Sequence, residues 1–210
     1  MSEKLLLDGD CLWIKQSKFL WLLDPGHGGL TRDGKYTTAP AKEFQHPGFM
    51  IYEGVINRAI KDLVKKALIA KRIDYAVVAD DAEDTSLEHR VRVADSIYEK
   101  DNRAVYLSIH SNAGGGEGFE IFTGPGQTES DKFAKVFEKF YREMGKDFKF
   151  RGLKEENFYV LRKTDCPAIL VENLFFDNLK EAQFLMTAAG RQKIADIIVA
   201  SILACESEVL

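Results

Sequence analysis

Residues 20–29 have the sequence Leu-Trp-Leu-Leu-Asp-Pro-Gly-His-Gly-Gly, which indicates the class of fold. An apolar run that stops at Asp-Pro-Gly is typical of a buried strand ending at a sheet edge. His27 follows that strand among glycines, which let other groups approach closely. Open α/β sheets bind ligands at the carboxyl ends of their strands, so His27 is a candidate functional residue. Alone, a histidine in a glycine-rich turn is more often a simple turn residue, so its meaning depends on partners.

Two further strands carry partners of that kind. Residues 104–112, Ala-Val-Tyr-Leu-Ser-Ile-His-Ser-Asn, bring His110 to the end of an apolar run, and residues 167–173 bring Glu172 to the end of another. Glu53 opens a strongly periodic helix, where an acidic side chain can also simply compensate the helix dipole. Two imidazoles and a carboxylate make a three-ligand catalytic zinc site with an open position, and one carboxylate remains as a possible base.

Four separated segments resemble, in order, the motifs of the zinc-dependent N-acetylmuramoyl-L-alanine amidases of the Amidase_3 type, which cut the glycan-to-peptide amide of bacterial cell wall. They are Leu-Asp-Pro-Gly-His-Gly-Gly, the helix-opening Glu53, Ser-Ile-His-Ser-Asn-Ala and Pro-Ala-Ile-Leu-Val-Glu-Asn. The likeness runs from about residue 20 to the C-terminus, and the stretches 86–91 and 151–162 also match.

This resemblance implies a role for each site residue. His27, Glu53 and His110 would hold Zn²⁺, which lowers the pKa of a bound water to about 7. Glu172 would act as the general base on that water and return the proton to the departing amide nitrogen. Alternatively, Glu172 is a buried carboxylate with a purely structural role. Asn112 and Arg162, near strand ends, are candidate substrate contacts.

The sequence departs from the family pattern in two places. Asn173-Leu174-Phe175 replaces the Gly-Phe usual after the catalytic glutamate, and the segment 30–52 is longer than usual. That segment has no helical or strand period, so we expect a long surface loop that forms one wall of the substrate groove, with Tyr36, Phe44 and Phe49 available to pack on substrate. His46 within it is expected to be a loop residue rather than a fourth ligand.

Strands alternate with helices along the chain, which predicts an α/β fold covered on both faces. The resemblance implies a single domain with a twisted, mostly parallel or mixed sheet of about six strands. We expect a catalytic domain over 20–210, preceded by an N-terminal hairpin extension over 1–19 in which residues 5–7 and 11–14 pair around Asp8-Gly9 and protect a sheet edge.

Hydrophobic periodicity places the elements of this domain. In the predicted helix 85–99, Thr85 and Glu88 form a capping box, Leu87 and Val91 face the core, and His89, Arg90 and Arg92 face solvent. The other expected helices are 53–71, 129–144, 179–186 and 191–205. The expected strands are the apolar run that begins at residue 20 and stops at Asp-Pro-Gly, followed by 73–79, 104–112, 118–123, 158–162 and 167–172.

Bulk properties exclude several classes of protein. The 210 residues fit one sizeable core, and a net charge of -4 gives no basic field for nucleic acid. Three widely spaced cysteines, Cys11, Cys166 and Cys205, suggest reduced thiols rather than a disulfide frame. The N-terminus does not resemble a secretory signal and no run reaches transmembrane length.

The expected partner is therefore bacterial peptidoglycan, without membrane insertion. The chain would be made in the cytoplasm without a signal peptide and act at the wall after release or export, as phage endolysins do through a holin-type pore. Two alternatives remain open, namely a zinc peptidase acting on stem or cross-bridge peptides and a non-catalytic wall-binding module. A phosphate-binding glycine loop is disfavoured because the Lys-Ser/Thr of a P-loop is absent.

Overall fold

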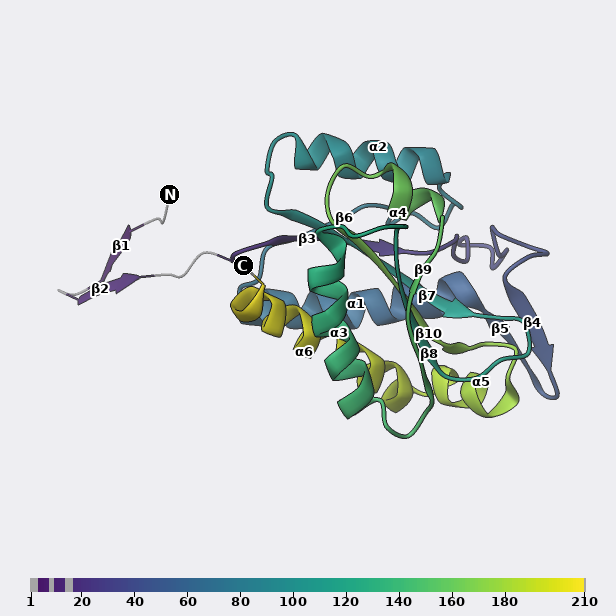
Figure 1. The fold of residues 1–210 in the computed structure, drawn as a ribbon. Helices are drawn as coiled ribbons and strands as arrows, with labels where there is room; N and C mark the ends of the chain where they lie inside the picture. Colours follow the sequence, from purple (N-terminus) through teal and green to yellow (C-terminus); the bar gives the residue numbers. More distant parts are fainter. Residues whose placement is uncertain (1–3, 8–9, 14–16, 210) are drawn as a thin grey trace.

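A six-stranded mixed sheet forms the centre of the computed structural model, which describes residues 4–7, 10–13 and 17–209 (Figure 1). Its strand order is β6-β3-β7-β10-β8-β9. The first four strands in this order run parallel, whereas β8 pairs antiparallel with β10 and parallel with β9. The strands are β3 (Leu20–Pro25), β6 (Tyr75–Val77), β7 (Ala104–Asn112), β8 (Phe119–Thr123), β9 (Phe150–Glu155) and β10 (Ala168–Phe175).

Helices cover both faces of the sheet, but unequally (Figure 1). The larger layer consists of α1 (Glu53–Lys71), α3 (Ser130–Met144), α5 (Leu179–Met186) and α6 (Ala188–Glu208). The smaller layer consists of α2 (Leu87–Tyr98) and the short α4 (Tyr159–Lys163). The predicted fold class, an α/β domain with a six-stranded mixed sheet and helices on both faces, is confirmed.

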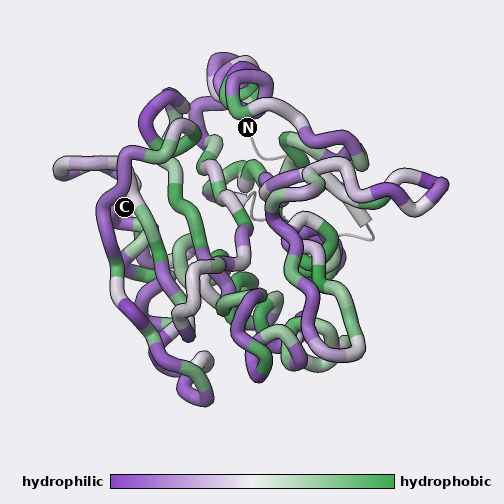
Figure 2. The backbone as a smooth tube through the Cα atoms, turned by 90° about the vertical axis from the view of Figure 1, so that its right-hand side faces the viewer, coloured by the Kyte–Doolittle hydropathy of each residue, from purple (hydrophilic) through white to green (hydrophobic). Residues whose placement is uncertain are grey.

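Alternate residues of each central strand belong to two separate cores. In β7, Val105, Leu107 and Ile109 pack in the core under the larger helical layer, and Tyr106 packs in the core under α2 and α4. Burial on both faces explains why these strands read as continuous apolar runs in the sequence. Figure 2 shows the hydrophobic segments gathered inside and hydrophilic loops around them.

The smaller layer leaves part of its face of the sheet uncovered. Ala104, Tyr106, Ala168 and Leu170 are buried beneath α2 and α4. Further along the same face, His110, Asn112 and Glu172 are only partly buried. The carboxyl ends of β7 and β10 therefore offer a surface on which polar side chains can meet a ligand.

One strand near the end of the sheet was predicted wrongly and another was missed. The expected strand 158–162 is instead helix α4 with its N-cap Phe158, and the sixth strand is β9, which the sequence pattern did not indicate. A five-residue apolar run has too few positions for its period to separate strand from helix. Val160 and Leu161 instead bury together against the core beneath α2.

Helix α2 differs from its prediction at its start and on its faces. Ser86, not Thr85, is the N-cap, and its hydroxyl accepts a hydrogen bond from the His89 amide at 3.3 Å. Leu87 is 54% exposed, whereas Arg90 is only 2% exposed, so both were assigned to the wrong side. Elsewhere the expected strand 73–79 is reduced to β6, and the last helix starts earlier than expected, capped by Thr187.

The segment 30–52 contains a hairpin, so the prediction of no regular structure there is wrong. Strand β4 (Glu43–His46) pairs antiparallel with β5 (Phe49–Tyr52), directly before α1. Tyr36 is 4% exposed and its hydroxyl accepts from the Gly54 amide at 3.1 Å, so it supports the start of α1 rather than a groove wall. Phe44 is exposed, and Phe49 packs against the larger core.

The predicted N-terminal pairing is confirmed. Strands β1 (Lys4–Leu7) and β2 (Asp10–Trp13) pair antiparallel, with Leu6 opposite Cys11. They form a sheet of their own, and neither strand pairs with the described strands of the central sheet, so the expected edge protection by strand pairing is not found. Ile14 lies outside the described residues.

Two remaining observations bear on the bulk predictions. Cys166 and Cys205 are buried free thiols, and burial raises the pKa of Cys166 to about 12. Of the helices in the described part of the chain, none combines the length and apolar character needed to cross a membrane.

Candidate metal centre

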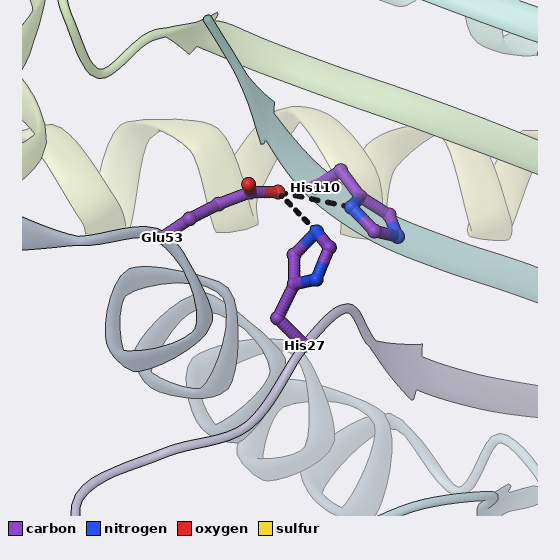
Figure 3. A group of neighbouring side chains, drawn as sticks. All are labelled: His27, Glu53 and His110. Carbon is purple, nitrogen blue, oxygen red and sulfur yellow. Dashed lines mark hydrogen bonds and ion pairs between the residues drawn. The ribbon is translucent and has the colours of Figure 1, made fainter. Parts of the chain in front are cut away.

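His27, Glu53 and His110 converge from three separate elements (Figure 3). His27 lies in the turn after β3, Glu53 is the first residue of α1, and His110 lies near the end of β7. One nitrogen of each histidine and one oxygen of Glu53 all lie within 4.8 Å of one another. Glu53 Oε1 is 3.2 Å from His27 Nε2 and 3.0 Å from His110 Nδ1.

Glycines make this close approach possible. A Cβ at Gly26 would lie 2.0 Å from Cε1 of His110, and a Cβ at Gly54 would lie 1.8 Å from the carbonyl oxygen of Gly28. The first would displace the imidazole, and the second would push the start of α1 away from the turn that carries His27. Gly26 and Gly54 are therefore needed for the close packing of β3, α1 and His110 around the cluster.

The two oxygens of the Glu53 carboxylate have different surroundings. Glu53 is 1% exposed, and Oε1 accepts from Asn57 Nδ2 at 3.3 Å and from the Ser111 amide at 3.4 Å, besides His110. Oε2 is buried without a hydrogen bond from any described residue, and Lys42 Nζ lies 3.7 Å from it. A buried, unsatisfied carboxylate oxygen is costly unless a cation or donor binds it.

Burial and neighbouring charges shift the pKa values of Glu53, His27 and His110 in different directions. Burial raises the pKa of Glu53, but the hydrogen bonds and charges of His110 and His27 outweigh it and hold the pKa well below its usual range. Burial lowers the pKa of His27. Burial also lowers the pKa of His110, but the hydrogen bond and charge of Glu53, helped by Glu172, reverse this and leave it raised.

Glu172 lies beside this cluster, on the strand next to His110. The parallel pairing of β10 with β7 places Glu172 directly opposite His110, so the two side chains share a face of the sheet. Glu172 Oε2 is buried and accepts no hydrogen bond from the described residues. Burial raises the pKa of Glu172 to about 8. A carboxylate held in this way requires a nearby cation or a proton.

These observations fit a divalent cation. Two imidazole nitrogens and a carboxylate oxygen form the donor set of a catalytic zinc site, and no thiolate is among them. Glu53 Oε2 and Glu172 Oε2 are both buried without a hydrogen bond from a described residue, and a bound cation and its water could satisfy them. Asn173, the residue after Glu172, donates from Nδ2 to the His110 carbonyl at 3.0 Å and so fixes that strand end.

Sequence reasoning missed the support under His27. Arg90 pairs with Asp24 in the buried interior and also donates to the carbonyls of Pro25 at 2.9 Å and His27 at 3.1 Å. Tyr106 donates to the other oxygen of Asp24 at 2.6 Å. A carboxylate ending an apolar strand was the available signal, because a buried Asp24 needs a cationic partner.

The other predicted residues fall in different places. Asn112 lies on the same face as His110, and its Nδ2 donates to Glu120 Oε2 at 2.6 Å. Arg162 is exposed on α4 and lines a cavity with Cys166 and Pro167, away from the metal cluster. His46 is buried and its Nε2 lies 2.8 Å from the Phe176 carbonyl oxygen, so it is not among the clustered ligands.

A cavity of about 300 Å³ opens directly beside the two histidines. His27 and His110 form one side, and the start of α2 forms the other, with Thr85, Ser86 and Leu87. Val160 of α4 closes it. The cavity gives a ligand access to the clustered nitrogens from the uncovered face of the sheet.

Comparison with known proteins agrees with this geometry. The N-acetylmuramoyl-L-alanine amidase family model matches residues 22–204. The amidase CwlM of Bacillus licheniformis is 33% identical over 175 residues, covering 82% of this chain and 63% of that protein. The endolysin of Bacillus phage SPP1 is 30% identical over 188 residues, covering 86% of this chain and 63% of the endolysin.

Solved structures agree as well. The amidase structure from Clostridium difficile 630 is 26% identical, with a TM-score of 0.74 over 92% of this chain and 100% of that one. The chain spans less than two thirds of the length of the two curated relatives described above. The family match nevertheless spans the strands and helices that carry His27, Glu53, His110 and Glu172. The chain therefore belongs to the N-acetylmuramoyl-L-alanine amidase family.

Proposed function

We propose that this chain hydrolyses the amide bond between N-acetylmuramic acid and L-alanine in bacterial peptidoglycan, using Zn²⁺ held by His27, Glu53 and His110. One observation carries the proposal: three suitable ligands converge, and the unsatisfied carboxylate of Glu172 lies opposite His110 on the neighbouring strand. The family match supports the same chemistry.

The residues divide the reaction between them. Zn²⁺ held by His27, Glu53 and His110 would polarise the scissile carbonyl and supply a water acidic enough to lose its proton at neutral pH. Glu172 takes the proton from the attacking water and returns it to the amide nitrogen as the stem peptide leaves. His110 and Glu172 share a face of the sheet, so the proposed general base lies on the same side of the sheet as a proposed metal ligand.

Asn112 is proposed as a substrate contact, because it lies two residues beyond His110 on the uncovered face. A direct contact with Arg162 requires the substrate to extend to the second cavity, beside Cys166 and Pro167. Variants at these two positions test both contacts: loss of a direct contact should raise KM for purified wall with little change in kcat, whereas an unchanged KM argues against the contact.

The decisive experiment is mass spectrometry of the products released from purified wall, with and without a chelator. The proposal expects free stem peptides with an N-terminal L-alanine, and no such product after zinc removal. Cleavage within the stem or cross-bridge peptides would instead identify a zinc peptidase. Sedimentation with wall but no released product would identify a binding module.

We further propose that residues 20–210 form the catalytic domain and that 1–19 are an extension. The Lys18 amide donates to Glu206 Oε2 at 2.6 Å, so a truncation test should begin at Ser17 to keep this contact. The truncated chain is expected to retain activity on wall.

Access to the wall through a pore-forming partner also stays a prediction. Permeabilising cells that express the protein is expected to trigger lysis. Prompt lysis on expression alone would contradict it.

A further inference from the structure

The uncovered face of the sheet continues past Glu172 toward β9. Antiparallel pairing places Glu120 of β8 directly opposite Glu172, so His110, Glu172 and Glu120 form a row across three adjacent strands on one face. The next strand in the sheet is β9, which lies at the edge (Figure 1). A substrate that reaches the metal cluster over this face therefore also meets the side chains of β9.

Two cations of β9, Arg151 and Lys154, gather around Glu120. Arg151 Nε donates to Glu120 Oε1 at 2.7 Å, and Lys154 Nζ pairs with the same oxygen. The other oxygen of Glu120 accepts from Asn112. Burial raises the pKa of Glu120, but Arg151 and Lys154 outweigh it and hold the pKa below its usual range. Glu120 is thus charged, and two positive side chains against one carboxylate leave one net positive charge.

A β-bulge directs Arg151 to this face. Phe119 pairs with Phe150 and Ile121 with Leu153, so two residues of β9, Arg151 and Gly152, stand opposite Glu120 alone. Gly152 has a φ of 119°, a conformation that other residues rarely adopt. Bulges commonly re-aim a side chain in this way near functional sites.

Arg151 is held in place, but it keeps hydrogen-bond donors that are not used by any described residue. Its guanidinium lies over the Phe175 ring at 5.2 Å from the centroid. Its two terminal nitrogens donate to no described residue, and 31% of the side chain is exposed, with 39% for Lys154. A guanidinium fixed at Nε with both terminal nitrogens open is suited to bind a carboxylate through two parallel hydrogen bonds.

From these contacts we propose that Arg151 and Lys154 form a subsite that binds a carboxylate of the stem peptide close to the scissile amide. The inference rests on the proposed amidase function. Adjacent strands are about 4.8 Å apart, so β9 lies roughly 10 Å from β10. An extended peptide advances about 3.4 Å per residue. A carboxylate on the second residue of the stem thus comes within reach of a long cationic side chain on β9.

Charge on the other side of the metal cluster supports this direction for the peptide. The segment 80–84 reads Asp-Asp-Ala-Glu-Asp, and Asp84 lines the cavity beside His27. Asp80 pairs with Lys61 and Asp84 lies 3.8 Å from Arg90, whereas Asp81 and Glu83 form no ion pair with a described residue. This side therefore keeps an excess of negative charge, which disfavours a substrate carboxylate, whereas β9 attracts it. The peptide therefore lies over β10, β8 and β9, and the sugar faces the cavity beside α2.

The test uses two synthetic N-acetylmuramoyl tripeptides that differ in one group. In both substrates the second residue is a glutamate joined to the third residue through its γ-carboxyl. Its α-carboxylate is free in one substrate and converted to a carboxamide in the other. Release of tripeptide is followed by mass spectrometry to give kcat and KM. The wild-type protein is expected to favour the carboxylate substrate by about tenfold in kcat/KM, mainly through KM, because the contact binds substrate and transition state alike.

Two variants and a control complete the test. Arg151→Gln and Lys154→Gln should each reduce the preference several-fold, and glutamine can still donate to Glu120. Lys146→Gln removes the same charge from an exposed residue between α3 and β9 and should leave the preference unchanged.

Equal kcat/KM for the two substrates in the wild type, or an unchanged preference in both β9 variants, overturns the subsite while the amidase function stands. Failure to release peptide from either substrate and from purified wall overturns the proposed function itself.

Discussion

Arg90 Nη2 donates a hydrogen bond of 3.1 Å to the backbone carbonyl of His27, 63 residues away in the sequence. The same carbonyl accepts from Arg58 Nη1 at 2.8 Å. His27 has a φ of 65°, an uncommon conformation for a residue other than glycine. Two guanidinium groups from α1 and α2 thus hold a strained turn so that its imidazole faces Glu53.

Replacement of Arg90 should be costly. Arg90→Met leaves Asp24, which is 1% exposed, without its cationic partner, and breaking such a buried pair costs about 3–5 kcal/mol. Urea unfolding measures the loss. Arg92→Met on the same helix is the control, because Arg92 is exposed and its effect should stay within about 0.5 kcal/mol. Similar losses in the two variants would contradict the role of Arg90.

Gly26→Ala tests the packing of glycine against His110. The added methyl group would overlap the imidazole at 2.0 Å, so zinc affinity should fall at least tenfold, because the ring can no longer reach Glu53. Gly34→Ala is the control, since nothing lies within 4 Å of its Cβ position and only its positive φ adds a cost of about 1–2 kcal/mol. Isothermal titration with zinc compares the two. Normal zinc affinity in Gly26→Ala would show that the ring has room to move.

The purified protein should contain about one zinc per chain, because its three proposed ligands are nitrogen and oxygen donors. His27→Ala and His110→Ala should lose zinc and activity together. Chelation should also lower the melting temperature, because zinc binds only the folded site. An active wild-type enzyme without zinc, after expression in zinc-supplemented medium, would refute the metal assignment.

Glu53 and Glu172 should separate metal binding from chemistry. Glu53→Ala removes a ligand and should reduce zinc affinity as well as turnover. Glu172→Gln keeps the side-chain volume, so zinc should remain bound while the rate falls by about 10²-fold to 10⁴-fold through loss of the general base. Metal analysis and wall turbidity measure the two effects. Loss of zinc from Glu172→Gln, or near-normal activity, would be incompatible with these roles.

The sequence alone determined the strands that carry the site and the residues at their ends. Apolar runs bounded by glycine or proline indicate buried strands, so the pattern predicted β3, β7 and β10. The polar residues at or just after their ends, His27, His110 and Glu172, were predicted with them. The periodicity of α1 placed Glu53 in the first turn of that helix, but only the two histidines and the family resemblance distinguished a metal ligand from a charge that compensates the helix dipole.

Only the tertiary structure decided the elements and contacts that depend on distant partners. Residues 159–163 are too few for their period to choose between strand and helix, and packing beneath α2 chose helix. Arg90 looks like a surface cation beside Arg92 until Asp24, 66 residues earlier, is brought against it. The grouping of Arg151 with Glu120 needs a bulge in an edge strand. Local sequence can indicate that a buried carboxylate such as Asp24 needs a cationic partner, but it cannot say which distant residue supplies that partner.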